Sequence, residues 1–444
     1  MMQPGSEVTL TAGSWATAAR VVAAFGVDVA TRGALRLVRR RAVPTRSPGV
    51  GGGDLGQEDA QLRREIEFVD ARRAEGLVPG TPLRVQPLAP VGLRWPQVPA
   101  SATRIEYVAT DSRDRLITTT GAVLVSHAPN AGHGVVAFAP STQGVAAHCN
   151  PSWSCEVGVH VFARPFDLIA AYEQPVINYF LARGLDVVFI DYPRDPELDI
   201  QFYCDHDAAA RSLVDAVTAA RQLGLISACA PVGLWGFSQG GGCVAAALER
   251  HAAGESPVEV AGAVVGAPPA DVAAVLDHVE GSLWSGVIGY ATAGLAVTSA
   301  QLRTEVFSLL SARGVREMAR LVGTCMVGAS QVVRNLDTRE WTRSGRSLSE
   351  ELCEWPALRA ECQRRLLGKR APRVPVVLWG STHDDVIPVT AVRALRERWC
   401  AGGAQVEWRE NGLLRIPGGT GLNHFLPYYR HAVADAEWLW DRLR

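Results

Sequence analysis

The stretch VGLWGFSQGGG, residues 232–242, decides how the rest of the chain is interpreted. An apolar run, Val232–Trp235, leads into GFSQG at residues 236–240, and the Ala-rich segment Cys243–Leu248 follows. This order predicts a buried strand, a tight turn and a helix, with Ser238 at the turn. Such a turn holds a serine hydroxyl exposed above a sheet, where it can act as a nucleophile. The alternative is a glycine-rich strand-to-helix turn without catalysis.

On both sides of this stretch, short apolar runs alternate with segments of helical periodicity. Several runs are continuously apolar, which is typical of parallel strands covered on both faces. The predicted fold class is therefore α/β, with a mostly parallel, doubly wound sheet. The predicted strands are Arg104–Thr110, Arg115–Ser126, Gly134–Ala139, Val187–Asp191, Val232–Gly236, Val260–Gly266, Val374–Gly380 and Gln405–Glu410. The predicted helices are Pro165–Arg183, His206–Leu223, Gln239–His251, Ala391–Trp399 and Phe425–Arg444.

One long segment interrupts this alternation. Between Gly266 and Val374 lie about a hundred residues without a convincing strand, too many for an ordinary connection. They contain helical stretches at Val287–Val297, Ala300–Arg313 and Ser349–Leu367, which we interpret as a helical cap inserted into the sheet protein. The predicted division is an N-terminal extension and linker (1–56), a first core part (57–274), the cap (275–370) and a last core part (371–444). Within the first of these, Ser47–Gly53 is predicted to be a flexible linker, and a polar helix is expected at Gln57–Glu75.

The composition excludes several classes of protein. The 444 residues are 48% hydrophobic and 20% charged, which excludes a disordered chain. The net charge of -1 provides no electrostatic case for a nucleic-acid partner. Nine cysteines form no CxxC pair, which argues against a zinc ribbon, and the histidines show no metal-ligand spacing. No uninterrupted apolar run is long enough to span a bilayer.

The N-terminal segment has the charge order of a signal peptide reversed. Glu7 precedes the mildly apolar stretch Trp15–Leu35, and the basic cluster Arg39–Arg41 follows it. This order favours a cytoplasmic location over secretion. With Arg36, the cluster could place an amphipathic helix on an anionic lipid surface. The alternative is a tail that is disordered or packed on the core.

A nucleophilic serine needs a base and an orienting carboxylate, in the chain order Ser, acid, His for an elbow of this kind. Asp384 and Asp385 follow the predicted strand Val374–Gly380 and face the same crevice as the elbow. Either can be the acid, and the second could instead cap the following helix. His424 follows the last strand and precedes the terminal helix, so we predict that it is the base. His383 is expected to be a loop neighbour of the acid.

A series of landmarks along residues 65–444 resembles the secretory lipase family of α/β-hydrolases, known from actinobacteria and fungi. The landmarks are Gly80–Arg84, Ser141–Gly144, Cys149–Ser152, Ala182–Val188 with Asp191–Tyr192, Leu213–Val217, Gly236–Gly242, Asp384–Pro388 and His424. The resemblance implies an esterase or lipase with a helical cap over an acyl-binding pocket. It implies no metal or organic cofactor.

The resemblance also assigns roles to individual residues. It makes Ser238 the nucleophile, His424 the general base, and Asp384, four residues before a proline, the acid. The oxyanion hole is then the backbone N–H of Gln239 with that of Thr142.

The chain departs from the family in one place, because Pro140-Ser141 stands where many bacterial members have His-Gly. That leaves the second oxyanion donor open. Cys149 and Cys155 are close enough in sequence to pair, and two free thiols are equally compatible with the sequence.

Cap residues are expected to contribute to the substrate site, because the insertion follows the strand after the elbow. We predict that Trp284 and Ile288 line an acyl tunnel leading to Ser238.

Three functions remain open from these residues. The first is a serine carboxylic-ester hydrolase that cleaves lipid or other hydrophobic esters through an acyl-enzyme. The second is an intracellular acyltransferase or thioesterase that uses the same triad on a specialised metabolite. The third is a binding protein with a decayed site, against which the intact Ser238, Asp384 and His424 argue. The oligomeric state is not predicted.

Overall fold

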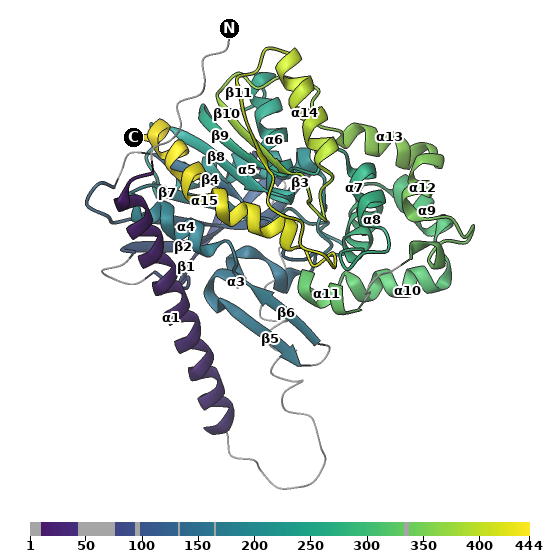
Figure 1. Ribbon diagram of the computed structural model, residues 1–444, viewed down its shortest axis with the longest axis horizontal. Coiled ribbons are helices and arrows are strands. Elements are labelled where there is room, and N and C mark those ends of the chain that lie inside the picture. The colour runs from purple at the N-terminus through teal and green to yellow at the C-terminus, as the bar shows by residue number, and fades with distance from the viewer. Residues whose placement is uncertain (1–9, 43–75, 94–97, 132–133, 164–165, 333–336) are drawn as a thin grey trace.

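A nine-stranded sheet forms the centre of the computed structural model, which describes residues 10–42, 76–93, 98–131, 134–163, 166–332 and 337–444 (Figure 1). Its strand order is β1-β2-β3-β7-β4-β8-β9-β10-β11. The strands are β1 (Pro82–Leu88), β2 (Ala100–Thr110), β3 (Leu116–Ser126), β4 (Val135–Ala139), β7 (Asp186–Ile190), β8 (Val232–Phe237), β9 (Val260–Gly266), β10 (Val376–Ser381) and β11 (Val406–Asn411). The six strands from β7 to β11 in this order are parallel, and β1 to β3 join them antiparallel. The prediction of a mostly parallel sheet is confirmed.

The eight predicted strands are present, with ends shifted by a few residues, and the sequence reasoning missed β1. This strand carries Pro82 and Pro87 and lies at one end of the sheet. Proline lacks the N–H that a ladder needs, so it made this segment look unlike a strand, but an edge strand tolerates it.

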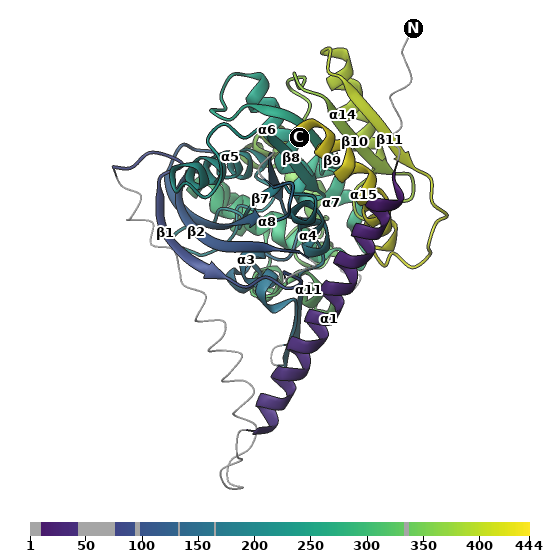
Figure 2. The same ribbon diagram turned by 90° about the vertical axis from the view of Figure 1, so that its left-hand side faces the viewer.

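Helices cover both faces of the sheet (Figure 2). On one face, α5 (His206–Gln222) and α6 (Gln239–Ala252) pack together against the central strands. On the other, α4 (Gln174–Ala182) packs beside α15 (Leu422–Leu443). The helix α14 (Val389–Ala401) packs against β10 and β11 on the same face as α6, and its Trp399 indole N–H donates to Glu249 of α6 at 3.2 Å. The central strands β4, β8 and β10 are consequently buried along their whole length. Their burial explains the continuous apolar runs in the sequence.

The helix predicted at Pro165–Arg183 is wrong in its first half. Phe166–Ala170 forms strand β6, which pairs with β5 (Val159–Ala163) in an antiparallel hairpin, and α3 (Pro151–Val157) precedes it. Burial alternates along β6, as the period of a strand requires. The helix α4 begins only at Gln174, with Pro175 in its first turn, where proline is well tolerated.

Between β9 and β10, the described residues form seven α-helices, which lie on the right-hand side of Figure 1. They are α7 (Val272–Val279), α8 (Gly286–Thr298), α9 (Ala300–Leu309), α10 (Ala312–Leu321), α11 (Met326–Val332), α12 (Leu348–Glu354) and α13 (Pro356–Arg365). The predicted helices Ala300–Arg313 and Ser349–Leu367 are each two helices. The breaks fall where Ser311 caps α10 through the Gly314 N–H and where Pro356 begins α13. The cap boundaries at 275 and 370 remain a prediction.

The N-terminal extension contains a long helix, α1 (Ala12–Ala42), that packs against α4 and α15. Ser14, Val21 and Asp28 are buried at intervals of seven residues, which marks one seam of contact along the helix. The Asp28 carboxylate accepts the Gly92 N–H at 2.9 Å and pairs with Arg32 at 3.1 Å. This part of the extension is thus packed on the core. The predicted linker Ser47–Gly53 and the predicted helix Gln57–Glu75 lie outside the described residues, as do the side chains of Arg36 and Arg39–Arg41.

None of the described helices combines the length and apolar character needed to cross a membrane.

Candidate active site

Ser238 stands at the sharp turn between β8 and α6. Its backbone has φ 55° and ψ −119°, a conformation that costs a non-glycine residue about 1–3 kcal/mol. A Cβ at Gly236 would overlap the Gly240 carbonyl, and a Cβ at Gly240 would overlap the carbonyl oxygen of Ala139 on β4. Both glycines of the pentapeptide are therefore required by close backbone approach. This geometry is that of the predicted elbow.

Asp384, in the loop after β10, and His424, in the first turn of α15, form a hydrogen-bonded pair. The Nδ1–H of His424 donates to Asp384 Oδ2 at 2.8 Å, which leaves Nε2 as the nitrogen able to accept a proton. The other carboxylate oxygen, Oδ1, accepts the backbone N–H groups of Val386 and Ile387 at 2.9 and 2.8 Å. Both carboxylate oxygens are thus hydrogen-bonded, so Asp384 is fixed in its loop and holds the His424 ring in one orientation.

Ser238 and His424 line one cavity, which Asp384 flanks behind the imidazole. The His424 ring packs against Phe237, the residue before the serine, with ring centroids 4.5 Å apart. All three side chains are buried. The cavity wall is mostly apolar and combines core and cap; it includes Thr142, Val275, Leu276, Trp284, Val287, Met326 and Ile387. The structure brings the predicted serine, base and acid together.

Asp385 has a different place from the helix cap that the sequence suggested. The residue preceding α14 is Pro388, and no side chain caps this helix. Asp385 Oδ2 instead accepts the Gly421 N–H at 2.9 Å and the Asn423 side-chain N–H at 3.3 Å. Asp385 therefore tethers the start of α15, which carries His424. His383 is exposed, as expected of a loop neighbour.

Two backbone N–H groups are available for an oxyanion beside Ser238. Gln239 is the first residue of α6, so its N–H has no acceptor within the helix. In the loop after β4, the Ser141 N–H donates to Glu173 Oε2 at 2.6 Å. Among the hydrogen bonds of the described residues, the Thr142 N–H has no acceptor. The geometry therefore favours Thr142 over Ser141 as the second donor.

This oxyanion loop is held by groups that the sequence reasoning missed. The Tyr192 hydroxyl donates to the Pro140 carbonyl, and the Tyr172 hydroxyl donates to the Thr142 carbonyl at 3.0 Å. Ser141 has no positive φ, so glycine is not needed at this position.

Tyr192, Tyr172 and Glu173 together clamp the oxyanion loop by hydrogen bonds. The carboxyl group of Glu173 is buried. Burial raises the pKa of Glu173 to about 8, against the lowering effect of its hydrogen bonds. No sequence motif pointed to Glu173, because its role depends on contact with a loop 32 residues earlier.

The two predicted cap residues differ in placement. Trp284 lines the cavity and packs against Phe425, with ring centroids 5.9 Å apart. Ile288 is completely buried and is not among the residues that line the cavity. Val287 and Ala291, which lie one helical turn apart on α8, take that position instead. Ile288 therefore does not line this cavity, because helix packing sets which side of α8 faces it.

The disulfide also differs from the pairing considered from the sequence. Cys149 is bonded to Cys325, at the start of α11, and Cys155 is a buried free thiol. Cys155 lies in α3 and packs into the main core, whereas Cys149 packs in a separate cluster with Trp153, Phe162, Ile169 and Cys325. The two cysteines are close in sequence but are buried in different clusters.

Comparison with known proteins identifies the family of the chain. Residues 166–444 match the family model described as secretory lipase. The chain belongs to the secretory lipase family. The resemblance found in the sequence is thus confirmed.

The curated relatives of this secretory lipase family member include named lipases. One from Mycobacterium tuberculosis, named a probable inactive lipase, is 27% identical over 75% of this chain and 73% of its own length. The secreted triacylglycerol lipase LIP5 of Malassezia globosa is 25% identical over 59% of this chain and 54% of its own. The chain therefore spans about half the length of the second relative.

Among solved structures, Candida antarctica lipase A in its closed state superposes with a TM-score of 0.68. The sequences are 15% identical, and the superposition covers 83% of this chain and 85% of that one. This likeness confirms the α/β-hydrolase fold.

Proposed function

We propose that the protein is a serine carboxylic-ester hydrolase that cleaves hydrophobic esters through an acyl-enzyme. The observation that carries the proposal is the convergence of Ser238, His424 and Asp384 on one apolar cavity beside two open N–H groups. Membership of a family named for lipases supports the same reaction type.

In the proposed reaction, Ser238 Oγ attacks the acyl carbon while His424 Nε2 takes its proton. Asp384 stabilises the imidazolium through Nδ1–H. The tetrahedral oxyanion accepts hydrogen bonds from the backbone N–H groups of Gln239 and Thr142. Collapse releases the alcohol, which receives the proton from His424. A water molecule activated by His424 then attacks the acyl-enzyme and releases the carboxylic acid.

The cavity indicates the substrate class and the state of the cap. Most of its wall is apolar, which suits an acyl chain. Its volume is about 30 Å³, room for one or two waters rather than an ester. An ester therefore enters only when cap residues such as Trp284 move apart from the core.

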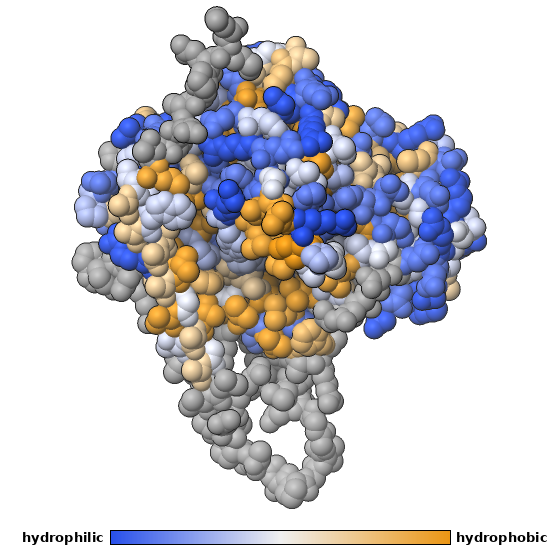
Figure 3. Space-filling view, viewed as in Figure 1, coloured by the Kyte–Doolittle hydropathy of each residue, from blue (hydrophilic) through white to orange (hydrophobic). Residues whose placement is uncertain are grey.

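We further propose that a lipid surface meets the face that surrounds His424. Leu422, Leu426 and Tyr429 are exposed on α15, on either side of the buried His424, and Trp15 and Val22 are exposed on α1. An apolar groove of about 600 Å³ lies between these two helices and α4. Figure 3 shows apolar side chains gathered in the middle of this face. Serine variants at Leu426 and Trp15 should lose binding to triolein emulsion droplets while keeping the hydrolysis of a soluble short ester. Equal droplet binding by the variants would place the lipid contact elsewhere.

The family and its secreted relatives favour secretion over the cytoplasmic location predicted from the N-terminal charge order. The buried disulfide Cys149–Cys325 is in keeping with an oxidising environment.

A fluorophosphonate probe followed by peptide mapping tests the proposal. The expected result is a single adduct on Ser238, together with hydrolysis of medium- and long-chain nitrophenyl esters, and neither in Ser238→Ala. No adduct on Ser238 would overturn the assignment of the nucleophile. An acyl-enzyme that forms from a nitrophenyl ester but persists in water would favour the alternative, an acyltransferase or thioesterase.

A further inference from the structure

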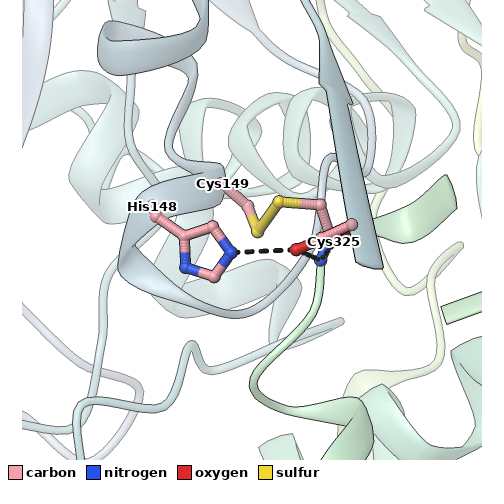
Figure 4. A group of neighbouring side chains, drawn as sticks. His148, Cys149 and Cys325 are labelled. Carbon is pink, nitrogen blue, oxygen red and sulfur yellow. Dashed lines mark hydrogen bonds and ion pairs between the residues drawn. A yellow bond between two sulfur atoms is a disulfide. The ribbon is translucent and has the colours of Figure 1, made fainter. Parts of the chain in front are cut away.

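Four side chains that the proposed reaction does not use meet at the contact between the core and the cap. They are His148, Cys149, Asp167 and Cys325, all buried, and one ligand-type atom of each lies within 4.8 Å of those of the other three. His148 Nε2 meets Asp167 Oδ2 at 3.0 Å, and the Cys149–Cys325 disulfide lies beside the imidazole ring (Figure 4). Three separate segments of the chain supply the cluster, so no spacing of residues in the sequence predicted it.

The set of donor atoms is one that zinc prefers. Zn²⁺ in structural sites takes four ligands in a tetrahedron, drawn from thiolate, imidazole and carboxylate. Metal–ligand distances of about 2.0–2.3 Å place the ligand atoms of such a site about 3.3–3.8 Å apart. The four ligand atoms lie within 4.8 Å of one another, and the two sulfurs are covalently bonded. Reduction would allow the sulfurs to separate to about 3.8 Å.

Hydrogen bonds already position the carboxylate member of the cluster. The Cys325 N–H lies 3.0 Å from both oxygens of Asp167, and the Leu168 N–H donates to Oδ1 at 2.8 Å. Backbone donors of this kind hold ligating carboxylates in known metal sites. They leave Oδ2, the oxygen that faces His148, directed into the cluster.

The cluster also sits where a cross-link affects the proposed active site. Cys325 forms a β-bridge with Gly144, and the Met326 N–H donates to the Gln143 carbonyl at 2.9 Å. The pair Gly144 and Gln143 belongs to the oxyanion loop, and Met326 lines the cavity. A side chain at Gly144 would lie 2.7 Å from Cys325 and 2.8 Å from the Cys149 sulfur, so the contact is close. Any bond between Cys149 and Cys325 therefore holds α11 of the cap against the oxyanion loop.

We propose that the reduced protein binds one Zn²⁺ through Cys149, Cys325, His148 and Asp167. An external dithiol supplies two electrons and two protons to the Cys149–Cys325 disulfide and is itself oxidised to a disulfide. The metal then displaces the two thiol protons and is held by two thiolates, one imidazole nitrogen and one carboxylate oxygen. The metal replaces the disulfide as the cross-link, so α11 stays held against the oxyanion loop in a reducing environment. This inference does not depend on the proposed esterase activity.

Cobalt provides the direct probe, because thiolate ligands to tetrahedral Co²⁺ absorb in the near ultraviolet. The experiment uses full-length protein in which the exposed thiols Cys229, Cys353 and Cys400 are replaced by serine. The protein is reduced with a dithiol, freed of reductant without oxygen and titrated with Co²⁺, which is then displaced by Zn²⁺. The expected result is one equivalent of Co²⁺ with thiolate charge-transfer bands, and no such bands in the oxidised protein. Zn²⁺ should also raise the melting temperature of the reduced protein.

Two variants test the ligand set. Cys149→Ser should lose about half of the charge-transfer intensity. His148→Ala should weaken Zn²⁺ binding by more than about 100-fold, beyond the 10–100-fold typical of losing an outer partner. As a control for folding, each variant should show the native far-ultraviolet circular dichroism spectrum before it is reduced. Failure of the reduced parent protein to bind a stoichiometric metal, or unchanged affinity in His148→Ala, would overturn the proposal.

Discussion

Asp384 and His424 come from the segments that follow the neighbouring strands β10 and β11, whereas Thr142 is held by side chains of three separate segments, those of Tyr172, Tyr203 and Gln239. On the acid–base side, the hydrogen bonds of the Asp384 carboxylate run to its own loop and to His424, while its backbone carbonyl meets His278 Nε2 of α7 at 3.0 Å. On the oxyanion side, Tyr172 and Glu173 clamp the loop after β4, and Cys325 of the cap contacts it. The acid–base side is built from the segments that follow two neighbouring parallel strands, β10 and β11. The oxyanion side depends on how the whole molecule packs.

The largest expected effect comes from removing the nucleophile or the base. Ser238→Ala and His424→Ala should each lower kcat by about 10⁶-fold, and the double variant should be no worse, because the two residues act as a unit. The rate that remains above the uncatalysed reaction measures what the oxyanion side contributes alone. Initial rates on a nitrophenyl ester check this, with circular dichroism as the control for folding. Losses that multiply in the double variant would contradict a shared triad.

Asp384→Asn should have the next largest effect, a loss of about 10⁴-fold in kcat with an intact fold. The amide no longer fixes the imidazole tautomer. The neighbouring Asp385→Asn is the matched control, because it changes the same charge one residue away. It should cost about 1–3 kcal/mol of stability, since Asp385 tethers Gly421 and Asn423, with a much smaller loss in kcat. Exchange of the two phenotypes would move the acid to Asp385.

The oxyanion side predicts a smaller effect on rate and a characteristic dependence on pH. Glu173→Ala should lower kcat by about 10- to 100-fold, because the Ser141 N–H loses its acceptor. Glu173→Gln retains an acceptor oxygen and should stay within a few-fold of the parent protein near pH 6.

The pH dependence follows from the raised pKa of Glu173, about 8 in the folded protein against an ordinary value of 4.5. Between these values the folded state binds the extra proton, so the contribution of Glu173 to stability falls as pH rises. Glu173→Gln cannot ionise, and its melting temperature relative to the parent protein should therefore rise between pH 5 and 8 and level off above. A constant difference across this range would show that Glu173 is not buried in the way described.

The smallest expected effect distinguishes the cavity wall from the core of the cap. Trp284→Ala should change the ratio of long-chain to short-chain ester hydrolysis by a few-fold to about 10-fold. Ile288→Ala should cost about 2–5 kcal/mol of stability and leave that ratio unchanged, because Ile288 packs in the core. Rates across a chain-length series, with melting temperatures for both variants, provide the comparison. A shift in chain-length preference from Ile288→Ala would show that the cap opens along a different face of α8.

The sequence by itself determined the features that depend on short-range geometry. The parallel strands follow from continuous apolar runs, and the elbow follows from glycines that flank Ser238. Both patterns are written in consecutive residues, because burial on two faces and close backbone approach constrain each position separately. The meeting of Ser238, Asp384 and His424 was predictable for a related reason. Parallel strands end at the same edge of the sheet, so the residues that follow them lie close together even when long segments of chain separate them.

Tertiary structure alone decided the features that join distant segments. The pairing of Cys149 with Cys325, the clamp of Glu173 on Ser141 and the choice of Val287 over Ile288 all depend on how helices pack on the sheet. Asp385 likewise looked like a local helix cap until the loop before α15 was seen to lie within its reach. Such contacts produce no periodic pattern or fixed spacing in the sequence. They depend on how whole helices and strands pack and rotate against one another, which a few consecutive residues cannot specify.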